Sequence, residues 1–136
     1  MKNHVLTIAA FIVATFAVQA ISHFVLAAEH YAAIPYIRKE PIFAFGFVAM
    51  IIQGGVLSVM YRRHVAVQGS SIGLAIGFAW TMGAFLVSYM ALAEAAKYRV
   101  PSIPSWVAVE VSSGLLQFGI FGGLLHLIYR EGSTGR

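Results

Sequence analysis

Residues 105–129 read SWVAVEVSSGLLQFGIFGGLLHLIY, an apolar run that is interrupted by one carboxylate, Glu110. At about 1.5 Å per residue, a helix of this length exceeds the roughly 30 Å hydrocarbon core of a bilayer. Glu110, Ser113 and Gln117 recur at helical spacing and therefore share one face of that helix. A carboxyl group at such depth is costly unless it is paired or hydrogen-bonded. This face must therefore contact protein, and Glu110 is a candidate functional residue.

The composition of the whole chain is typical of a membrane protein. Of its 136 residues, 60% are hydrophobic and 10% are charged, whereas about a quarter of the residues of a soluble domain are charged. Four apolar runs are long enough to cross a bilayer as helices: residues 5–28, 42–61, 72–96 and 105–129. We therefore expect one all-α transmembrane domain over residues 1–136, a four-helix bundle that runs up-down-up-down. The shorter alternating segments of a transmembrane β-barrel are absent from the sequence.

The amino-acid usage excludes several kinds of chemistry. The chain contains no cysteine, which excludes disulfides, thiolate metal ligands, iron–sulfur clusters and thiol nucleophiles. Its nine basic residues are scattered over loops and tails and form no stripe along one element, so we expect no nucleic-acid partner. The expected partners are the lipid bilayer and, through helix faces, membrane-protein subunits or further copies of the chain.

The basic residues near the spans predict an orientation. Five of them lie on the side that holds both termini, and four lie on the opposite side. They are Lys2, Arg62, Arg63, Arg130 and Arg136 against Arg38, Lys39, Lys97 and Arg99. Because basic loops are retained in the cytoplasm, this excess predicts that both termini are cytoplasmic. The end of the bundle opposite the termini is called the outer end below, and the other end is called the inner end.

Small residues recur at spacings that allow helices to approach closely. Gly73-xxx-Gly77 opens the third span, Gly119-xxx-Gly123 lies in the fourth, and the second span is lined with glycine and alanine. The predicted helix-packing positions are Gly46, Gly54, Gly55, Gly73, Gly77, Gly119 and Gly123. These are more than four helices need among themselves, which favours contacts with other chains.

Polar side chains of three spans fall at a similar depth near the outer end. His23 of the first span lies at the depth of Glu94 in the third span and Glu110 in the fourth. Burial raises the pKa of a carboxyl group and lowers that of histidine, so such a group of residues can exchange protons or bind a cation. The predicted outer pocket for a proton or a ligand consists of Gln19, His23, Glu94, Glu110, Ser113 and Gln117.

Two plainer interpretations of the same residues stay open. The polar stripe along the first span is also typical of an interhelical hydrogen-bond seam; it consists of Thr15, Gln19, Ser22 and His23. The two glutamates can equally be wetted and paired with Lys97 or Arg99 across the short turn before the fourth span.

The five histidines divide between the two ends of the bundle. His23 and His30 belong to the outer end, whereas His4, His64 and His126 belong to the inner end. Histidines of opposite ends cannot share one metal, and no HExxH or Glu-xx-His motif occurs, so no metal site is predicted. Only the inner set could supply the two ligands of a haem. No cofactor is predicted, although haem, quinone or pigment between the helices stays open.

Four features extend over most of the chain. The first span ends in polar and aromatic residues, Arg38-Lys39-Glu40-Pro41 leads into the second span, the third span has spaced glycines, and the fourth is rich in glycine. In these features the chain resembles a family of small four-span bacterial membrane proteins of uncharacterised function. The resemblance implies a four-helix bundle in the bacterial inner membrane and carries no catalytic residues.

Two functions are compatible with these patterns. The first is a non-enzymatic protein that acts through its helix faces, either as an accessory or assembly subunit of a larger membrane complex or as a homo-oligomer. The alternative is a small transporter or ligand-binding protein that uses His23 and Glu110 to bind a proton, a cation or a small apolar molecule. We predict no enzyme, because the sequence offers no recognisable nucleophile and base pair.

Overall fold

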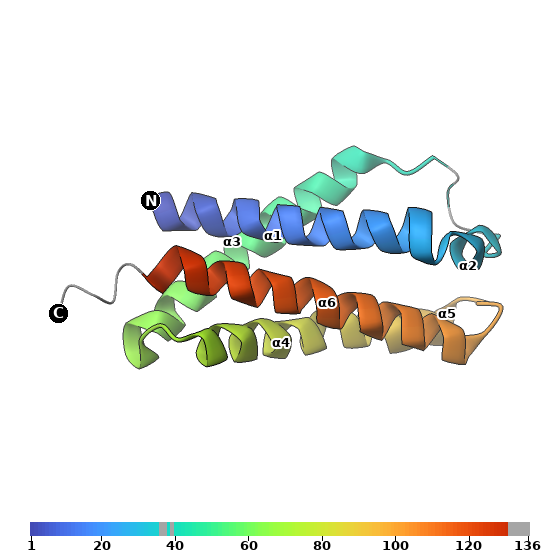
Figure 1. The fold of residues 1–136 in the computed structure, drawn as a ribbon. Helices are drawn as coiled ribbons and strands as arrows, with labels where there is room; N and C mark the ends of the chain where they lie inside the picture. Colours follow the sequence, from blue (N-terminus) through green and yellow to red (C-terminus); the bar gives the residue numbers. More distant parts are fainter. Residues whose placement is uncertain (36–37, 39, 131–136) are drawn as a thin grey trace.

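Four long helices make up most of the computed structural model, which describes residues 1–35, 38 and 40–130 (Figure 1). The elements in chain order are α1 (Lys2–Ile21), η1 (Ser22–Leu26), α2 (Ala28–Ala32), α3 (Phe43–Gln68), α4 (Ile72–Ser88), η2 (Tyr89–Ala93), α5 (Glu94–Lys97) and α6 (Ile103–Tyr129). The elements η1 and η2 are π-helical turns. No strand occurs within the described part of the chain.

The prediction of four spans in one helical bundle is confirmed. The segments Lys2–Leu26, Phe43–Gln68, Ile72–Lys97 and Ile103–Tyr129 are long and apolar enough to cross a membrane. Successive long helices run in opposite directions, and the start of α1 lies at the same end of the bundle as the end of α6 (Figure 1).

Two boundaries differ from the prediction. The second span was expected to end at Tyr61, but α3 continues through Gln68 because no residue in between opposes a helix. It ends at Gly69, whose φ of 77° lies in the left-handed region that glycine adopts without strain. In the connection expected between residues 29 and 41, the short helix α2 forms at the outer end.

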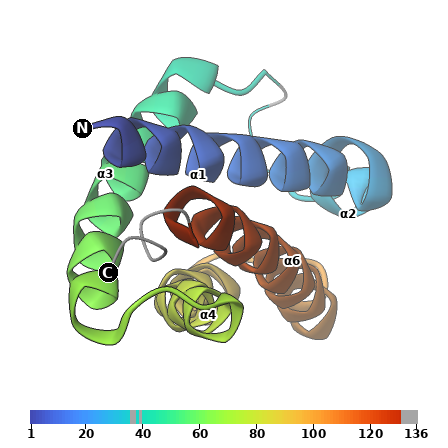
Figure 2. The same cartoon turned by 60° about the vertical axis from the view of Figure 1, so that its left-hand side comes forward.

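The helix α6 is central to the packing. It lies along α4 on one side and along α1 on the other, while α3 packs mainly against α1 (Figure 2). Phe118, Phe121 and Leu125 of α6 are buried in the resulting core together with Phe11 of α1. The rings of Phe11 and Phe121 meet edge to face, with their centroids 5.2 Å apart.

Glycines allow the close approach of α6 to α4 and of α3 to α1. A Cβ atom added to Gly122 would lie 2.8 Å from the Cα of Ile76, and one added to Gly54 would lie 3.2 Å from the Cα of Ile8. Gly83 and Gly114 likewise face side chains across the α4/α6 contact.

Most of the glycines that the sequence singled out do not lie in these contacts. Of the predicted positions, Gly54 lies against α1, and a Cβ on Gly119 would be 3.6 Å from the indole nitrogen of Trp80. A Cβ on the other five would meet no atom within 4 Å: Gly46, Gly55, Gly73, Gly77 and Gly123. Those five positions do not pack within the described part of this chain, because they face outward or into open space.

The helix α3 crosses the bundle at an angle, and only its second half packs closely (Figure 1). Residues 43–49 are all exposed, and the first buried residue of α3 is Met50. The start of α3 therefore stands away from α4, and a groove opens between them on the outer half of the molecule.

The surface of the bundle is apolar along all four spans. Phe45 of α3 is 74% exposed, and Phe85 of α4 is 78% exposed. A soluble monomer rarely exposes such extensive apolar surface, whereas lipid chains cover it without cost. This apolar surface is therefore suited to contact with lipid.

Candidate functional site

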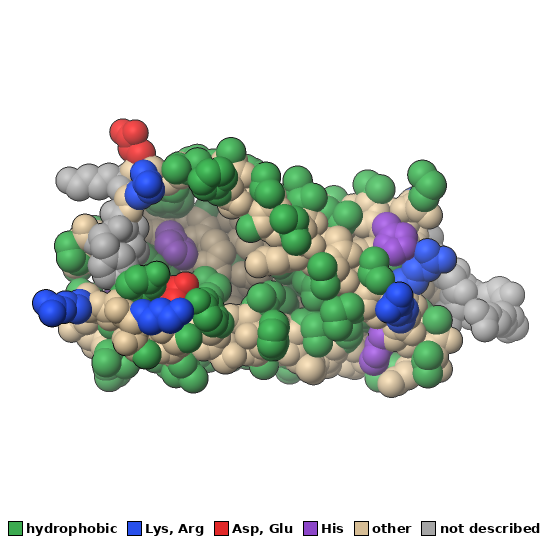
Figure 3. Space-filling view, turned by 180° about the vertical axis from the view of Figure 1, so that it is seen from behind, with side chains coloured by type: hydrophobic (Ala, Val, Ile, Leu, Met, Phe, Trp, Pro, Cys, Tyr) green, Lys and Arg blue, Asp and Glu red, His purple; other side chains and the backbone are tan. Residues whose placement is uncertain are grey.

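A groove between α3 and α4 has a volume of about 1820 Å³. Its walls are mostly apolar: one carries Phe45 and Phe47 of α3, and the other carries Phe85 of α4 with Met90 of η2. Figure 3 shows the hollow from the rear, bordered by hydrophobic side chains. At its bottom lie polar side chains of α1, η1, α2 and α6, which we call the polar floor: Thr15, Gln19, His23, Tyr31, Glu110 and Gln117.

The first part of the polar floor is a chain of hydrogen bonds between α1 and α6. The side-chain amide of Gln19 donates to Gln117 Oε1 over 2.9 Å, and the amide of Gln117 donates to Thr15 Oγ1, also over 2.9 Å. These bonds form the interhelical seam that the stripe on the first span suggested. They also fix Gln19 so that its Oε1 is buried and has no hydrogen-bond partner.

The second part of the polar floor is the pair of Tyr31 and Glu110. The hydroxyl of Tyr31 donates to Glu110 Oε1 over 2.6 Å, and both residues are buried, with exposed fractions of 6% and 3%. Burial raises the pKa of the Tyr31 hydroxyl, and the hydrogen bond to Glu110 and the charge of that carboxylate raise it further. Tyr31 therefore stays a hydrogen-bond donor to the carboxyl group at neutral pH.

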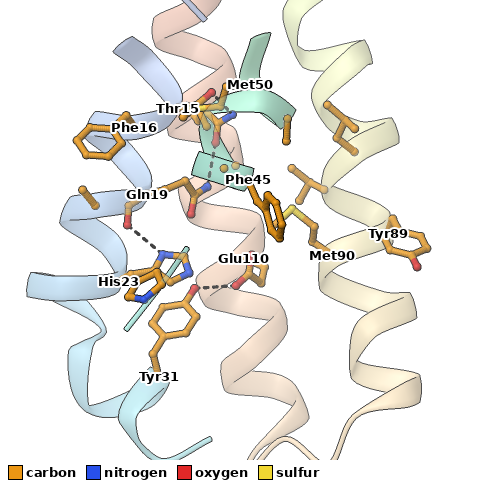
Figure 4. A pocket seen from close by; sticks show the side chains of 18 of the residues that line it. Thr15, Phe16, Gln19, His23, Tyr31, Phe45, Met50, Tyr89, Met90 and Glu110 are labelled. Atoms are coloured by element: carbon orange, nitrogen blue, oxygen red, sulfur yellow. Dashed lines mark hydrogen bonds between the residues drawn. The ribbon is translucent and has the colours of Figure 1, made fainter. Parts of the chain in front are cut away.

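His23 lies beside this pair (Figure 4). Its ring stacks on the ring of Tyr31, with centroids 3.8 Å apart and an angle of 14° between the planes. The Nδ1 atom lies 2.9 Å from the backbone oxygen of Gln19. A carbonyl oxygen can only accept, so Nδ1 carries the proton, and Nε2 of the neutral ring is left as an acceptor.

Two π-helical turns border the outer half of the groove. In η1 the backbone N–H of Ala27 donates to the oxygen of Ser22, five residues earlier, over 2.8 Å. In η2 the carbonyl oxygen of Met90 accepts a hydrogen bond from the indole of Trp106 over 3.1 Å. Both turns contribute residues to the lining of the groove. Single π-turns within helices occur frequently at functional sites.

The structure brings four of the six predicted pocket residues into the groove. Gln19, His23, Glu110 and Gln117 line it. Ser113 does not line it, and its hydroxyl donates to the backbone oxygen of Glu110 one turn earlier over 3.2 Å. Glu94 is half-buried at the same end but does not line the cavity either.

The alternative of a wetted Glu110 paired with a base does not hold. Glu110 is buried and takes its hydrogen bond from Tyr31. Lys97 donates instead to the hydroxyl of Tyr89 over 2.9 Å and lies 4.9 Å from the centre of that ring. No ion pair of Glu110 occurs among residues 1–35, 38 and 40–130.

The sequence did not single out Tyr31 as a site residue. The residue lies in a stretch that was expected to be a loop, and no helical spacing connects it with Glu110. The indication that the sequence did contain is the type of residue: Glu29, His30 and Tyr31 are polar or aromatic and directly follow an apolar span. The break at Ala27, with φ −119° and ψ 25°, turns α2 back so that Tyr31 reaches α6.

The inner end holds a separate group of polar residues. His4 Nδ1 lies 2.6 Å from Ser58 Oγ, and its Nε2 lies 3.0 Å from a guanidinium nitrogen of Arg62, so both ring nitrogens are occupied. Three further buried atoms there have no hydrogen-bond partner: His64 Nε2, His126 Nδ1 and Tyr129 OH. Within the described ranges, no group of three or more histidine or acidic side chains is placed to hold a metal ion.

Comparisons with family models, with curated protein sequences and with solved structures give no match to this chain. The chemistry of the groove is therefore the basis for any functional conclusion.

Proposed function

We propose that this chain is a binding protein for a lipid-like amphiphile, which it takes from the membrane into the groove between α3 and α4. The single observation that supports this proposal is the place of the Tyr31–Glu110 pair. These two polar groups are buried at the bottom of a cavity whose walls are mostly apolar. An ionisable group in such surroundings is retained at a cost, which argues for a ligand or a transported species. The proposal follows the second hypothesis from the sequence.

The size of the groove favours a long ligand. Sites for drug-sized molecules have volumes of roughly 300–1,000 Å³. The groove exceeds that range, at about 1820 Å³, and runs from the polar floor to the exposed aromatic residues of α3. A molecule with a polar head and an apolar chain would satisfy both parts at once, with its head on the polar floor and its chain along the phenylalanines.

The experiment fills the groove without touching the polar floor. Gly46 lines the groove, and a Cβ there meets no atom within 4 Å, so Gly46→Trp places an indole in the cavity without displacing the backbone. Gly73 on α4 is just as open but does not line the groove, so Gly73→Trp is the matched control. The bound amphiphile is extracted from protein purified in nanodiscs and quantified by mass spectrometry.

We expect the wild type and Gly73→Trp to retain about one equivalent of the same molecule, and Gly46→Trp to lose it. Glu110→Gln keeps an acceptor for Tyr31 but removes the charge, and it should weaken retention while the helical circular dichroism is unchanged. Equal retention by both tryptophan variants would show that the groove is not the binding site.

A second candidate function is that of a subunit in a larger assembly. Gly73 and Gly77 are four residues apart on an exposed face of α4, and neither contacts the rest of the described chain. Such a pair allows another helix to approach closely in a membrane. Gly77→Leu should then dissociate a complex that is seen by cross-linking in native membranes. Wild-type protein that cross-links to no other chain would count against this function.

A further inference from the structure

Four hydrogen bonds within the protein engage donor groups of the polar floor. The proton of Tyr31 goes to Glu110, the Nδ1 proton of His23 goes to the oxygen of Gln19, and the amide of Gln117 goes to Thr15. The amide of Gln19 donates in turn to Gln117. Each of these donor groups therefore makes its hydrogen bond within the protein.

Besides the second amide hydrogens of Gln19 and Gln117, several acceptors remain free on the polar floor. Gln19 Oε1 is buried without a partner. Glu110 has a second carboxylate oxygen, for which no hydrogen bond occurs in the described part of the chain, and His23 has Nε2. A buried acceptor without a donor costs free energy, so the floor favours a ligand that brings hydrogen atoms. Figure 4 shows the three side chains around the same part of the groove.

The charged residues of the groove also favour a ligand that donates hydrogen bonds. Glu110 is 3% exposed and has no ion-pair partner among the described residues, although an isolated carboxylate in apolar surroundings is strongly disfavoured. Arg38 is the one arginine or lysine among the described lining residues, and it is exposed in the connection after α2. The bottom of the groove thus holds a buried carboxyl group and no arginine or lysine among the described residues.

The geometry points to an amphiphile with a primary ammonium head as the occupant, an inference that rests on the proposed binding function and names the class of its ligand. An ammonium group carries three donors and one positive charge. It would donate to the free carboxyl oxygen of Glu110 and to His23 Nε2 while its chain follows the phenylalanines. A hydroxyl head fits second best, because it supplies one donor without a charge. A carboxylate head is rejected, because it brings acceptors and a like charge.

The test uses the position of the two tryptophans. Trp106 is buried, and its ring centroid lies 6.2 Å from that of Tyr31, whereas Trp80 is half exposed on the side of α4. Trp80→Phe therefore leaves a reporter next to the polar floor, and Trp106→Phe leaves one that does not line the groove. Three nitroxide-labelled probes that share one saturated chain are titrated into nanodiscs: a primary amine, an alcohol and a carboxylic acid.

We expect the amine to quench Trp106 at concentrations at least about tenfold lower than the alcohol, and the acid to quench it last. Trp80 should report similar quenching by all three probes, which measures their partition into the bilayer. Glu110→Gln in the Trp80→Phe background should reduce the amine to the level of the alcohol. Gly46→Trp is assayed in parallel by displacement of the labelled amine, followed through the nitroxide spectrum.

The possible failures are distinguishable. If all three probes quench Trp106 equally and Gly46→Trp displaces them all, the groove binds amphiphiles without regard to the head, and the ammonium inference is wrong. If the acid binds most tightly, the inference is also wrong. If no probe reaches Trp106 above the level seen with Trp80, and extraction finds no bound amphiphile, the proposed binding function itself falls.

Discussion

Tyr31 donates a hydrogen bond of 2.6 Å to Glu110, a residue 79 positions later in the chain. The bond ties the short helix α2 to the central helix α6 at the outer end. A helix of five residues is unstable by itself, so α2 depends on tertiary contacts. These are supplied by Tyr31 and Ile34, which pack in one cluster with Trp106 and Ala95. The polar floor of the groove and the closure of the outer end therefore share one interaction.

Replacing Tyr31 with phenylalanine tests the value of this interaction. The substitution keeps the ring stacked on His23 but leaves the buried carboxyl group of Glu110 without its hydrogen bond. A hydrogen bond to a charged group contributes about 1.5–3 kcal/mol, and we expect Tyr31→Phe to lower the free energy of unfolding by that amount. The measurement is reversible unfolding of the protein in mixed micelles.

Tyr89→Phe is the matched control for that experiment. Its hydroxyl is bonded to Lys97 on the exposed side of η2, so its loss should change stability by less than about 0.5 kcal/mol. Equal effects of the two substitutions would mean that burial of the Tyr31–Glu110 bond adds nothing to stability.

The raised pKa of Tyr31 predicts how this contribution depends on pH. In the unfolded chain the hydroxyl ionises near the ordinary value of 10.0, whereas in the folded chain it keeps its proton to higher pH. The folded state binds the proton more tightly, so the stabilisation is fully present below pH 10 and is lost as pH rises above it. The difference in unfolding free energy between wild type and Tyr31→Phe should thus be constant from pH 7 to pH 9 and narrow above about pH 10. A difference that widens in alkali would contradict this reading.

Helical periodicity was sufficient to predict part of the site from the sequence. Gln19 and Gln117 lie at regular spacing within long apolar helices, so their depth and face follow from the number of turns. The same arithmetic placed His23 and Glu110 near one another, and all four line the groove. Glu94 lies close enough to Glu110 for their charges to interact but does not line the groove, because depth alone does not fix the direction of a side chain.

The groove itself was not predictable from those patterns. It exists because α3 is tilted away from α4, and tilt is set by packing rather than by the length of an apolar run. The two π-helical turns also leave no mark in hydropathy. Tyr31 was missed for a related reason, since its position depends on the helix break at Ala27 and not on a repeat.

The proposed orientation can be tested with single cysteines, because the natural chain has none. Glu40 precedes α3 at the outer end, and Gln68 ends α3 at the inner end, and both are exposed. If the termini are cytoplasmic in a bacterial inner membrane, a membrane-impermeant maleimide should label Glu40→Cys in intact spheroplasts and should label Gln68→Cys only after lysis. The opposite pattern would reverse the topology, and labelling of both in intact cells would argue against four crossings.

Two adjacent glycines of α6 provide a test of the central helix contact. A Cβ on Gly122 would lie 2.8 Å from the Cα of Ile76 and 3.2 Å from the oxygen of Ala75, both of which belong to the backbone of α4. Backbone atoms cannot turn aside as a flexible side chain can, so Gly122→Ala must push the two helices apart. Such overpacking costs about 1–3 kcal/mol, and we expect a loss of stability in that range.

Gly123 faces open space, where the same methyl group meets no atom within 4 Å. Gly123→Ala should therefore cause no loss and should gain up to about 1 kcal/mol, because alanine restricts the unfolded chain and favours the helix. Thermal unfolding of the two variants in the same micelles compares one methyl group on two sides of one helix. A stable Gly122→Ala protein would show that α4 and α6 do not approach as closely as this packing requires. The wall of the groove that α4 and η2 form would then lose the support that fixes it against α6.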